Sequence, residues 1–244
     1  SKYQSADYAG AERDLAAVYA RADTPAWLKE KALLDLAKSR TALKEHAAAR
    51  ESYRQLVKEY PETQSRDEAD YQIIATSLKL TDEKSARENL AAFRARNRAS
   101  PWFAEALNEL AEFYRRKKNF AESDAALSEL ESLRKKPAEK LDVLTAKAAL
   151  YQEQGRSKEA IRLIEKILQS EDVSEAIAIR ASTLLFQILE DAKEYAQGTA
   201  WADKLATRFA DNNRLSEEML LAQAHFLVLQ KNMAAGRDIL LPLS

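Results

Sequence analysis

The chain has 244 residues, 46% of them hydrophobic and 32% charged, with four glycines, five prolines and no cysteine. Its formal net charge of −1 argues against binding to nucleic acid or anionic lipid, and the lack of cysteine excludes disulfides and thiolate metal sites. No stretch approaches the ~18 consecutive apolar residues of a membrane-spanning helix. We therefore expect no nucleic-acid partner, no cofactor, no metal and no direct membrane insertion. Because glycine and proline are scarce, long helices with short connections are favoured.

A pattern of one small and two large apolar residues, spaced by four and then three positions, recurs along the chain. A small residue is followed by large apolar residues four and seven positions later, first as Ala11, Leu15 and Val18. These three positions share one face of a helix. The small residue returns after every 37 or 38 residues, at Ala11, Ala49, Ala86, Ser123, Ala160, Gly198 and Gly236. We predict that these residues pack repeated helices closely against their partners.

A second recurring position lies twelve residues before each of the last six small residues. It is occupied by Ala37, Ile74, Ala111, Ala148, Phe186 and Ala224. The position falls within a separate apolar stretch that also has helical spacing. Each repeat is therefore predicted to contain two amphipathic helices, which we call the first and the second helix. Ile74 and Phe186 depart from the small-residue pattern, so the packing of their repeats is expected to differ.

Helix boundary signals have the same period. Thr24-Pro25 and Ser100-Pro101 place a capping side chain before a proline, two repeats apart, and Pro137 follows one repeat later. The predicted chain organisation is a single array of repeats. Its parts are a partial repeat with a second helix at 1–24, repeats at 25–62, 63–99, 100–136, 137–173 and 174–211, and a partial repeat at 212–244.

These positions resemble the tetratricopeptide repeat family along nearly the whole chain. The best unit reads Leu144, Ala148, Tyr151, Gly155, Ala160, Ile164 and Ile167. Lys147 departs from the family pattern, and the period exceeds the usual length of about 34 residues. The resemblance implies an all-α, right-handed superhelix (α-solenoid) of antiparallel helix pairs, with about six repeats plus partial ends. The connection after Tyr60-Pro61 resembles repeats of bacterial cell-envelope proteins.

In this family the first helices line a groove that binds protein partners. The residues that the resemblance assigns to the groove are Leu34, Lys38, Tyr71, Ala75, Glu105, Asn108, Glu112, Arg115, Thr145, Ala149, Gln152, Thr183 and Gln187. Their mixed polarity favours an extended or helical peptide over a lipid. The family's clamp for acidic chaperone tails is not expected, because Leu34, Gln72 and Glu105 stand where its basic and amide residues would be.

Other candidate sites have structural interpretations. His46 and His225 lie more than four repeats apart and are not expected to share a metal. We interpret Glu105, Glu109 and Glu112 as a solvated helix face. The basic clusters at 94–98, 115–118 and 134–136 follow helix ends, where positive charge is stabilising.

The tryptophans are assigned mainly to packing. Trp27 and Trp102 start equivalent first helices and are predicted to pack successive repeats together. For Trp201, packing and an outer-face contact remain equal alternatives.

The sequence favours a non-enzymatic scaffold for protein–protein interaction, since it contains no nucleophile–base pair, phosphate loop or metal-ligand spacing. We expect a segment of a larger protein, located in the periplasm or cell envelope and serving an assembly or export system, with a cytoplasmic location as the alternative. The alternative function is a structural module that self-associates end to end through its terminal helices. Apolar Leu15, Val18, Leu240 and Leu241 at those helices suggest either a piece of a longer chain or a face covered by another subunit.

Overall fold

The computed structural model describes residues 7–241, which form thirteen α-helices and no strand. In order these are α1 (Tyr8–Ala20), α2 (Ala26–Ala42), α3 (His46–Glu59), α4 (Arg66–Lys79), α5 (Glu83–Asn97), α6 (Pro101–Arg116), α7 (Phe120–Leu133), α8 (Pro137–Glu153), α9 (Ser157–Gln169), α10 (Glu175–Asp191), α11 (Tyr195–Arg208), α12 (Asn213–Leu229) and α13 (Met233–Leu240). The even-numbered helices α2 to α12 are the first helices, and the odd-numbered helices are the second helices. The prediction of an all-α protein is confirmed.

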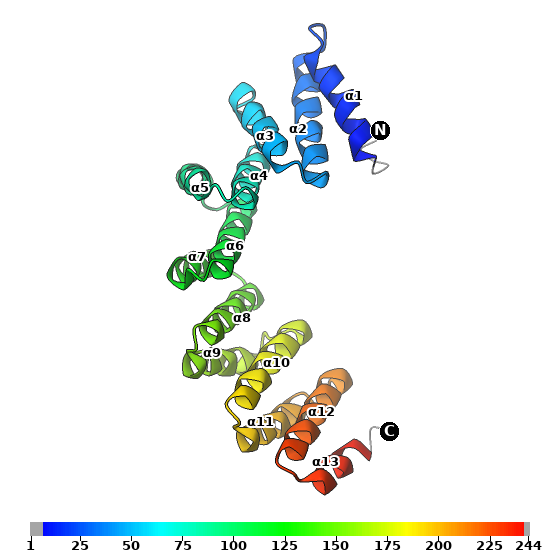
Figure 1. Ribbon diagram of the computed structural model, residues 1–244, viewed down its shortest axis with the longest axis vertical. Helices are drawn as coiled ribbons and strands as arrows, with labels where there is room; N and C mark the ends of the chain where they lie inside the picture. Colours follow the sequence, from blue (N-terminus) through cyan, green and yellow to red (C-terminus); the bar gives the residue numbers. More distant parts are fainter. Residues whose placement is uncertain (1–6, 242–244) are drawn as a thin grey trace. The chain divides into compact units, whose positions relative to one another are not determined.

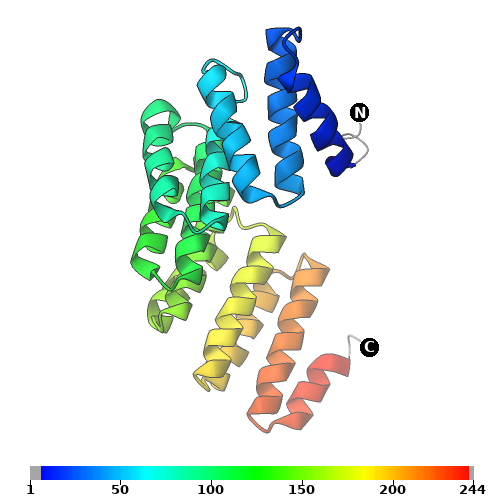
Figure 2. The ribbon, with the colours of Figure 1, turned by 45° about the horizontal axis from the view of Figure 1, so that its top comes forward.

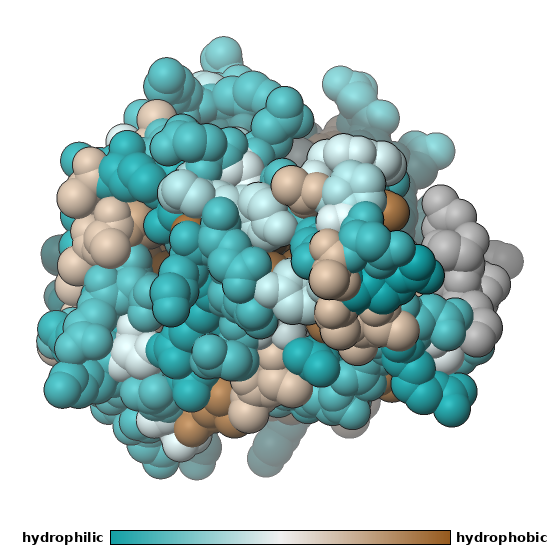
Figure 3. All heavy atoms as spheres, turned by 90° about the horizontal axis from the view of Figure 1, so that it is seen from above, coloured by the Kyte–Doolittle hydropathy of each residue, from teal (hydrophilic) through white to brown (hydrophobic). Residues whose placement is uncertain are grey.

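The helices form two compact units, one containing α1–α7 and the other α8–α13. Within each unit, the helices joined by short turns pack against each other as antiparallel neighbours (Figures 1 and 2). This arrangement is the one expected of a tetratricopeptide-like solenoid. The repeat boundaries and the handedness of a superhelix remain predictions. The face shown in Figure 3 is mainly hydrophilic, with small separate hydrophobic patches.

One type of turn joins the first helix of each pair to the second. In each turn a single residue has a positive φ, between 57° and 73°: Lys44, Thr81, Lys118, Gly155, Lys193 and Lys231. In the first turn, the Glu45 N–H donates to the Arg40 carbonyl at 2.9 Å and the Lys44 N–H donates to the Thr41 carbonyl at 3.0 Å. This pair of hydrogen bonds closes the end of α2 as in a Schellman motif. The turns therefore recur with the same period as the helices.

Of these six residues, Thr81 has the side chain least suited to a positive φ. It is β-branched and has a φ of 57°, a region that non-glycine residues enter at a cost. We expect Thr81→Gly to raise the free energy of unfolding by about 1 kcal/mol, because relief of strain exceeds the added flexibility of the unfolded chain. Urea denaturation followed by circular dichroism measures this change.

A matched substitution separates relief of strain from a general effect of glycine. Thr63 lies in the loop between α3 and α4 and does not have a positive φ. Thr63→Gly should lower stability, because the unfolded chain gains flexibility and the hydrogen bond from the Ser65 N–H to the Thr63 hydroxyl is lost. Loss of stability in Thr81→Gly as well would contradict the strain argument.

The small residues of the repeat all lie on second helices and are buried. Ala49, Ala86 and Ala160 are fully buried. At Ser123 the side-chain hydroxyl of α7 donates to the Ala111 carbonyl of α6 at 2.8 Å. The two residues are the small positions of one repeat, so the paired helices approach closely where small side chains were predicted to permit it.

Phe186, a large residue where most repeats have alanine, packs against a second large aromatic residue in the next helix pair. The rings of Phe186 on α10 and Phe226 on α12 meet edge to face, with their centroids 5.6 Å apart. Phe226 is fully buried and lies over Gly198 on α11, where a Cβ atom would come within 2.5 Å of the ring. The absence of a side chain at residue 198 thus leaves room for a large aromatic residue.

Candidate protein-binding cleft

In the α1–α7 unit, several predicted groove residues link consecutive first helices. The Lys38 ammonium group on α2 pairs with Glu68 on α4 at 2.8 Å. Leu34 is partly buried beside the core of α2 and α3, and Ala75 on α4 is buried. These side chains contribute to stacking, which leaves less of each one exposed to a partner.

Two aromatic residues make a similar link between α4 and α6. Tyr71 and Trp102 stack with their ring centroids 5.3 Å apart. Burial, followed by the charges of Glu109 and Glu105, raises the pKa of the Tyr71 hydroxyl. The prediction that Trp102 packs successive repeats together is confirmed for these two helices.

The corresponding prediction for Trp27 stays a prediction: its side chain is 67% exposed on α2, the earliest first helix among residues 7–241. Trp201 is partly buried against the core of the second unit, and the Lys204 ammonium group lies 4.5 Å from the centre of its ring. Its packing role is therefore supported.

Charged side chains in the first unit are extensively paired. Arg115 donates two hydrogen bonds to Glu112, and this contact lowers the pKa of the Glu112 carboxyl group. Arg94 donates two hydrogen bonds to the carboxylate of Glu129. Arg96 contacts Asp67 and Asp70 at 2.6 and 2.7 Å. The carboxylates neutralise much of the charge in the two basic clusters at 94–98 and 115–118.

Two of the predicted groove residues on α6, Glu105 and Asn108, are exposed.

The histidines are placed in different units. His46 starts α3 and its Nδ1 atom is buried without a hydrogen-bond partner, whereas His225 on α12 is exposed and contacts Glu190 at 3.1 Å. Across residues 7–241, no group of three or more metal-binding side chains is present.

In the α8–α13 unit, the predicted groove residues on α8 and α10 have different surroundings. Thr145, Ala149 and Gln152 on α8 are partly buried, and the Thr145 hydroxyl donates to the Leu141 carbonyl of its own helix at 2.8 Å. Thr183 and Gln187 on α10 are exposed and line a cleft between α10 and α12. The structure therefore brings together two of the predicted groove residues in a cavity.

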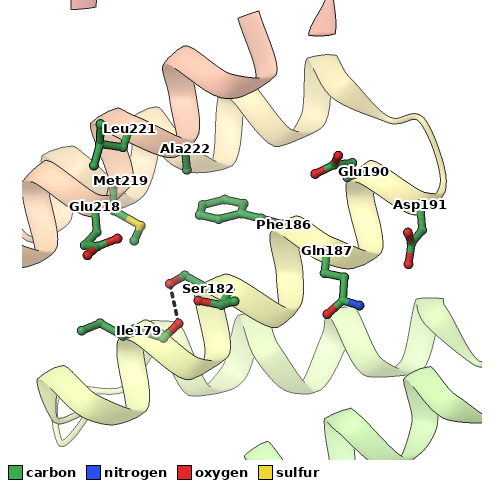
Figure 4. Close-up of a pocket in the computed structure, with 11 residues that line it drawn as sticks. Ile179, Ser182, Phe186, Gln187, Glu190, Asp191, Glu218, Met219, Leu221 and Ala222 are labelled. Atoms are coloured by element: carbon green, nitrogen blue, oxygen red, sulfur yellow. Dashed lines mark hydrogen bonds between the residues drawn. The ribbon is translucent and has the colours of Figure 1, made fainter. Parts of the chain in front are cut away.

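This α10–α12 cleft has a volume of about 380 Å³. The Phe186 ring lies between the two helices, with Met219 and Ala222 opposite it on α12 (Figure 4). Leu221 stands beside them and is 50% exposed. The cleft thus offers an apolar surface that is open to solvent.

The polar groups of the cleft are mainly acidic. Glu218 lies at one end of the cleft, and Glu190 and Asp191 lie at the other (Figure 4). Glu190 contacts His225 at 3.1 Å, whereas Asp191 and Glu218 have no ion-pair partner among residues 7–241. The lining contains no lysine or arginine. An apolar centre is therefore flanked by uncompensated negative charge.

A second cleft, of about 260 Å³, lies between α5, α6 and α7. Its charges are balanced, because Arg87 lies 3.6 Å from Glu122 and Arg94 lies 2.8 Å from Glu129. Ligand binding there would have to compete with existing ion pairs. The α10–α12 cleft is the better candidate for binding.

Sequence reasoning identified Thr183 and Gln187 but not the other lining residues of the cleft. Phe186 carried a signal, because it places a large aromatic side chain where most repeats have alanine. Glu218, Met219 and Leu221 belong to α12, whose partnership with α10 depends on the stacking of two repeats. Their roles could not be read from the sequence of one repeat.

Comparison with known proteins supports the resemblance of one repeat to the tetratricopeptide repeat. Residues 31–63, which include most of α2 and all of α3, match the family model of the tetratricopeptide repeat. No curated protein matches the chain. Tetratricopeptide repeats generally mediate protein–protein interaction and are generally not catalytic. Among the helices of residues 7–241, none has the length and apolar character needed to cross a membrane.

Proposed function

We propose that this chain is a non-enzymatic scaffold that binds partner proteins or peptides along its first helices. The α10–α12 cleft carries this proposal, since it joins an open apolar surface to polar groups and is formed by two first helices. The tetratricopeptide match at residues 31–63 supports the same class of function. The other surfaces of the first helices, with exposed residues such as Asn108, would extend the contact.

Site-specific photo-crosslinking tests the proposal. A photoreactive amino acid is placed at Asn108 or Gln187 on first helices, and at the exposed residues Ser128 or Lys166 on second helices. After irradiation in an extract of the source cells, we expect discrete protein adducts from the first-helix positions only. Equal adduct formation from both sets of helices would contradict a binding surface on the first helices.

Self-association is the second candidate function. Val228 on α12, Met233 at the start of α13 and Leu241 directly after α13 are 40%, 63% and 60% exposed. Trp27 on α2 is exposed as well. Stacking of copies end to end would bury these side chains. Sedimentation velocity over a range of concentrations distinguishes the functions: a species that stays monomeric removes self-association, and mass that rises with concentration supports it.

We also propose that the scaffold serves an assembly or export system in a bacterial periplasm or cell envelope, as part of a larger protein. The support is the resemblance of the segment after Tyr60-Pro61 to repeats of envelope proteins. Fractionation of source cells with an antibody against this chain tests the location. Recovery in the cytoplasmic fraction alone would favour the alternative location.

A further inference from the structure

We propose that the α10–α12 cleft binds a peptide segment in which large apolar side chains are flanked on both sides by lysine or arginine. The inference rests on the proposed function and specifies the chemistry of the partner. It follows from three features of the cleft: its apolar centre, the position of its acids and the absence of lysine and arginine from its lining.

The apolar centre requires an apolar ligand group. Phe186 is partly buried and lies opposite Met219, which is only 3% exposed, and Leu221 extends the same lining toward solvent. The volume of about 380 Å³ lies near the lower end of the range of about 300–1,000 Å³ for binding pockets. Such a space suits one or two large side chains of a peptide rather than a whole globular surface.

The acidic side chains lie at the two ends of the cleft, on either side of its apolar centre. Glu218 stands at one end, and Glu190 and Asp191 stand at the other, so the negative charges are separated by the apolar surface (Figure 4). A ligand that places its apolar group in the centre would extend toward an acid in either direction. Positive charge on both sides of the apolar group is therefore complementary to the cleft.

The arginines near the cleft are committed to other carboxylates. Arg180 on α10 pairs with Asp142 on α8, and Arg214 on α12 pairs with Glu175 on α10 at 3.2 Å. Neither lines the cleft. Among residues 7–241, Asp191 and Glu218 also have no ion-pair partner, in contrast to the balanced charges of the cleft between α5, α6 and α7.

Fluorescence anisotropy with defined peptides tests the inference. The probe is a short fluorescein-labelled peptide with a central Leu-Phe pair and two lysines on each side. Two control peptides replace the lysines with glutamates or the Leu-Phe pair with serines. We expect saturable binding of the probe to the full chain, at least about tenfold tighter than binding of either control, and weaker binding at higher salt.

Substitutions assign the binding to the cleft. Asp191→Asn with Glu218→Gln removes two unpaired charges, and we expect it to weaken binding of the probe by about fivefold. The matched control is Asp211→Asn with Glu217→Gln, which changes the net charge equally at exposed residues outside the lining. This control should leave the affinity within about twofold of the original. Leu221→Ser should weaken binding by about threefold through loss of apolar contact.

Each outcome bears on the inference. Equal binding of the lysine and glutamate peptides, equal effects of the two double variants, or no binding of the probe would overturn it. Circular dichroism of each variant shows whether the helices are retained, so that unfolding is recognised separately. If photo-crosslinks form on the first helices while the probe does not bind, the scaffold function stands and only the proposed partner chemistry fails.

Discussion

Phe226→Ala is expected to destabilise the α8–α13 unit by about 3–5 kcal/mol, the range typical of truncating a buried phenylalanine. The ring is fully buried, belongs to the core of this unit and meets Phe186 edge to face. Its removal leaves a cavity beside Gly198, which has no side chain to fill the space. The loss therefore includes both apolar burial and the contact between the two rings.

Trp201 allows the effect to be measured within this unit. It is the only tryptophan after residue 133 and packs against the same core as Phe226. Urea unfolding followed by Trp201 fluorescence, in a Trp27→Phe and Trp102→Phe background, gives the change in free energy. Leu221→Ala on α12 is the control and should cost little, since that side chain is half exposed. A loss below about 1 kcal/mol for Phe226→Ala would contradict the assigned packing.

Gly198→Leu is expected to lower the free energy of unfolding of the same unit by about 3 kcal/mol, the upper part of the usual range for overpacking. A Cβ atom alone would lie 2.5 Å from the Phe226 ring, and that ring is fully buried. The higher helix propensity of leucine offsets only about 1 kcal/mol of the strain.

Two further variants make this prediction specific. Ala200→Leu adds the same side chain at an exposed position of α11 and should be close to neutral. Gly198→Leu combined with Phe226→Ala should cost less than the sum of the two single changes, because the new side chain occupies the space left by the ring. Simple additivity in the double variant would show that residues 198 and 226 do not share this space.

The periodicity of small residues was sufficient to predict an all-α fold of paired helices. The reason is that close helix contact restricts side-chain size, so the restriction recurs with the repeat. The Ser123 hydroxyl, which contacts the Ala111 carbonyl, shows this contact directly. By contrast, only one of the six turns between paired helices has glycine at its residue with positive φ. The other turns lack a clear sequence signal, because an exposed lysine or threonine takes that conformation and the same pair of backbone hydrogen bonds closes the helix end.

The candidate site was less predictable than the fold. Thr183 and Gln187 were assigned to a groove by resemblance, and both line the cleft. The same reasoning placed Lys38 and Tyr71 in the groove, but these residues bind neighbouring first helices through an ion pair and an aromatic stack. Helical position indicates which face a residue occupies. It does not indicate whether a neighbouring repeat already uses that side chain.

The amino-acid sequence by itself determined the helices, their pairing and the period of the repeat, since these depend on residues close together in the chain. Only the tertiary structure decided that Phe226 fits over Gly198, that Tyr71 stacks on Trp102 and that, within residues 7–241, Asp191 and Glu218 have no ion-pair partner beside an apolar cleft. These features depend on how successive repeats stack. Contacts between repeats combine side chains about 37 residues apart, and no local pattern specifies which of them will meet.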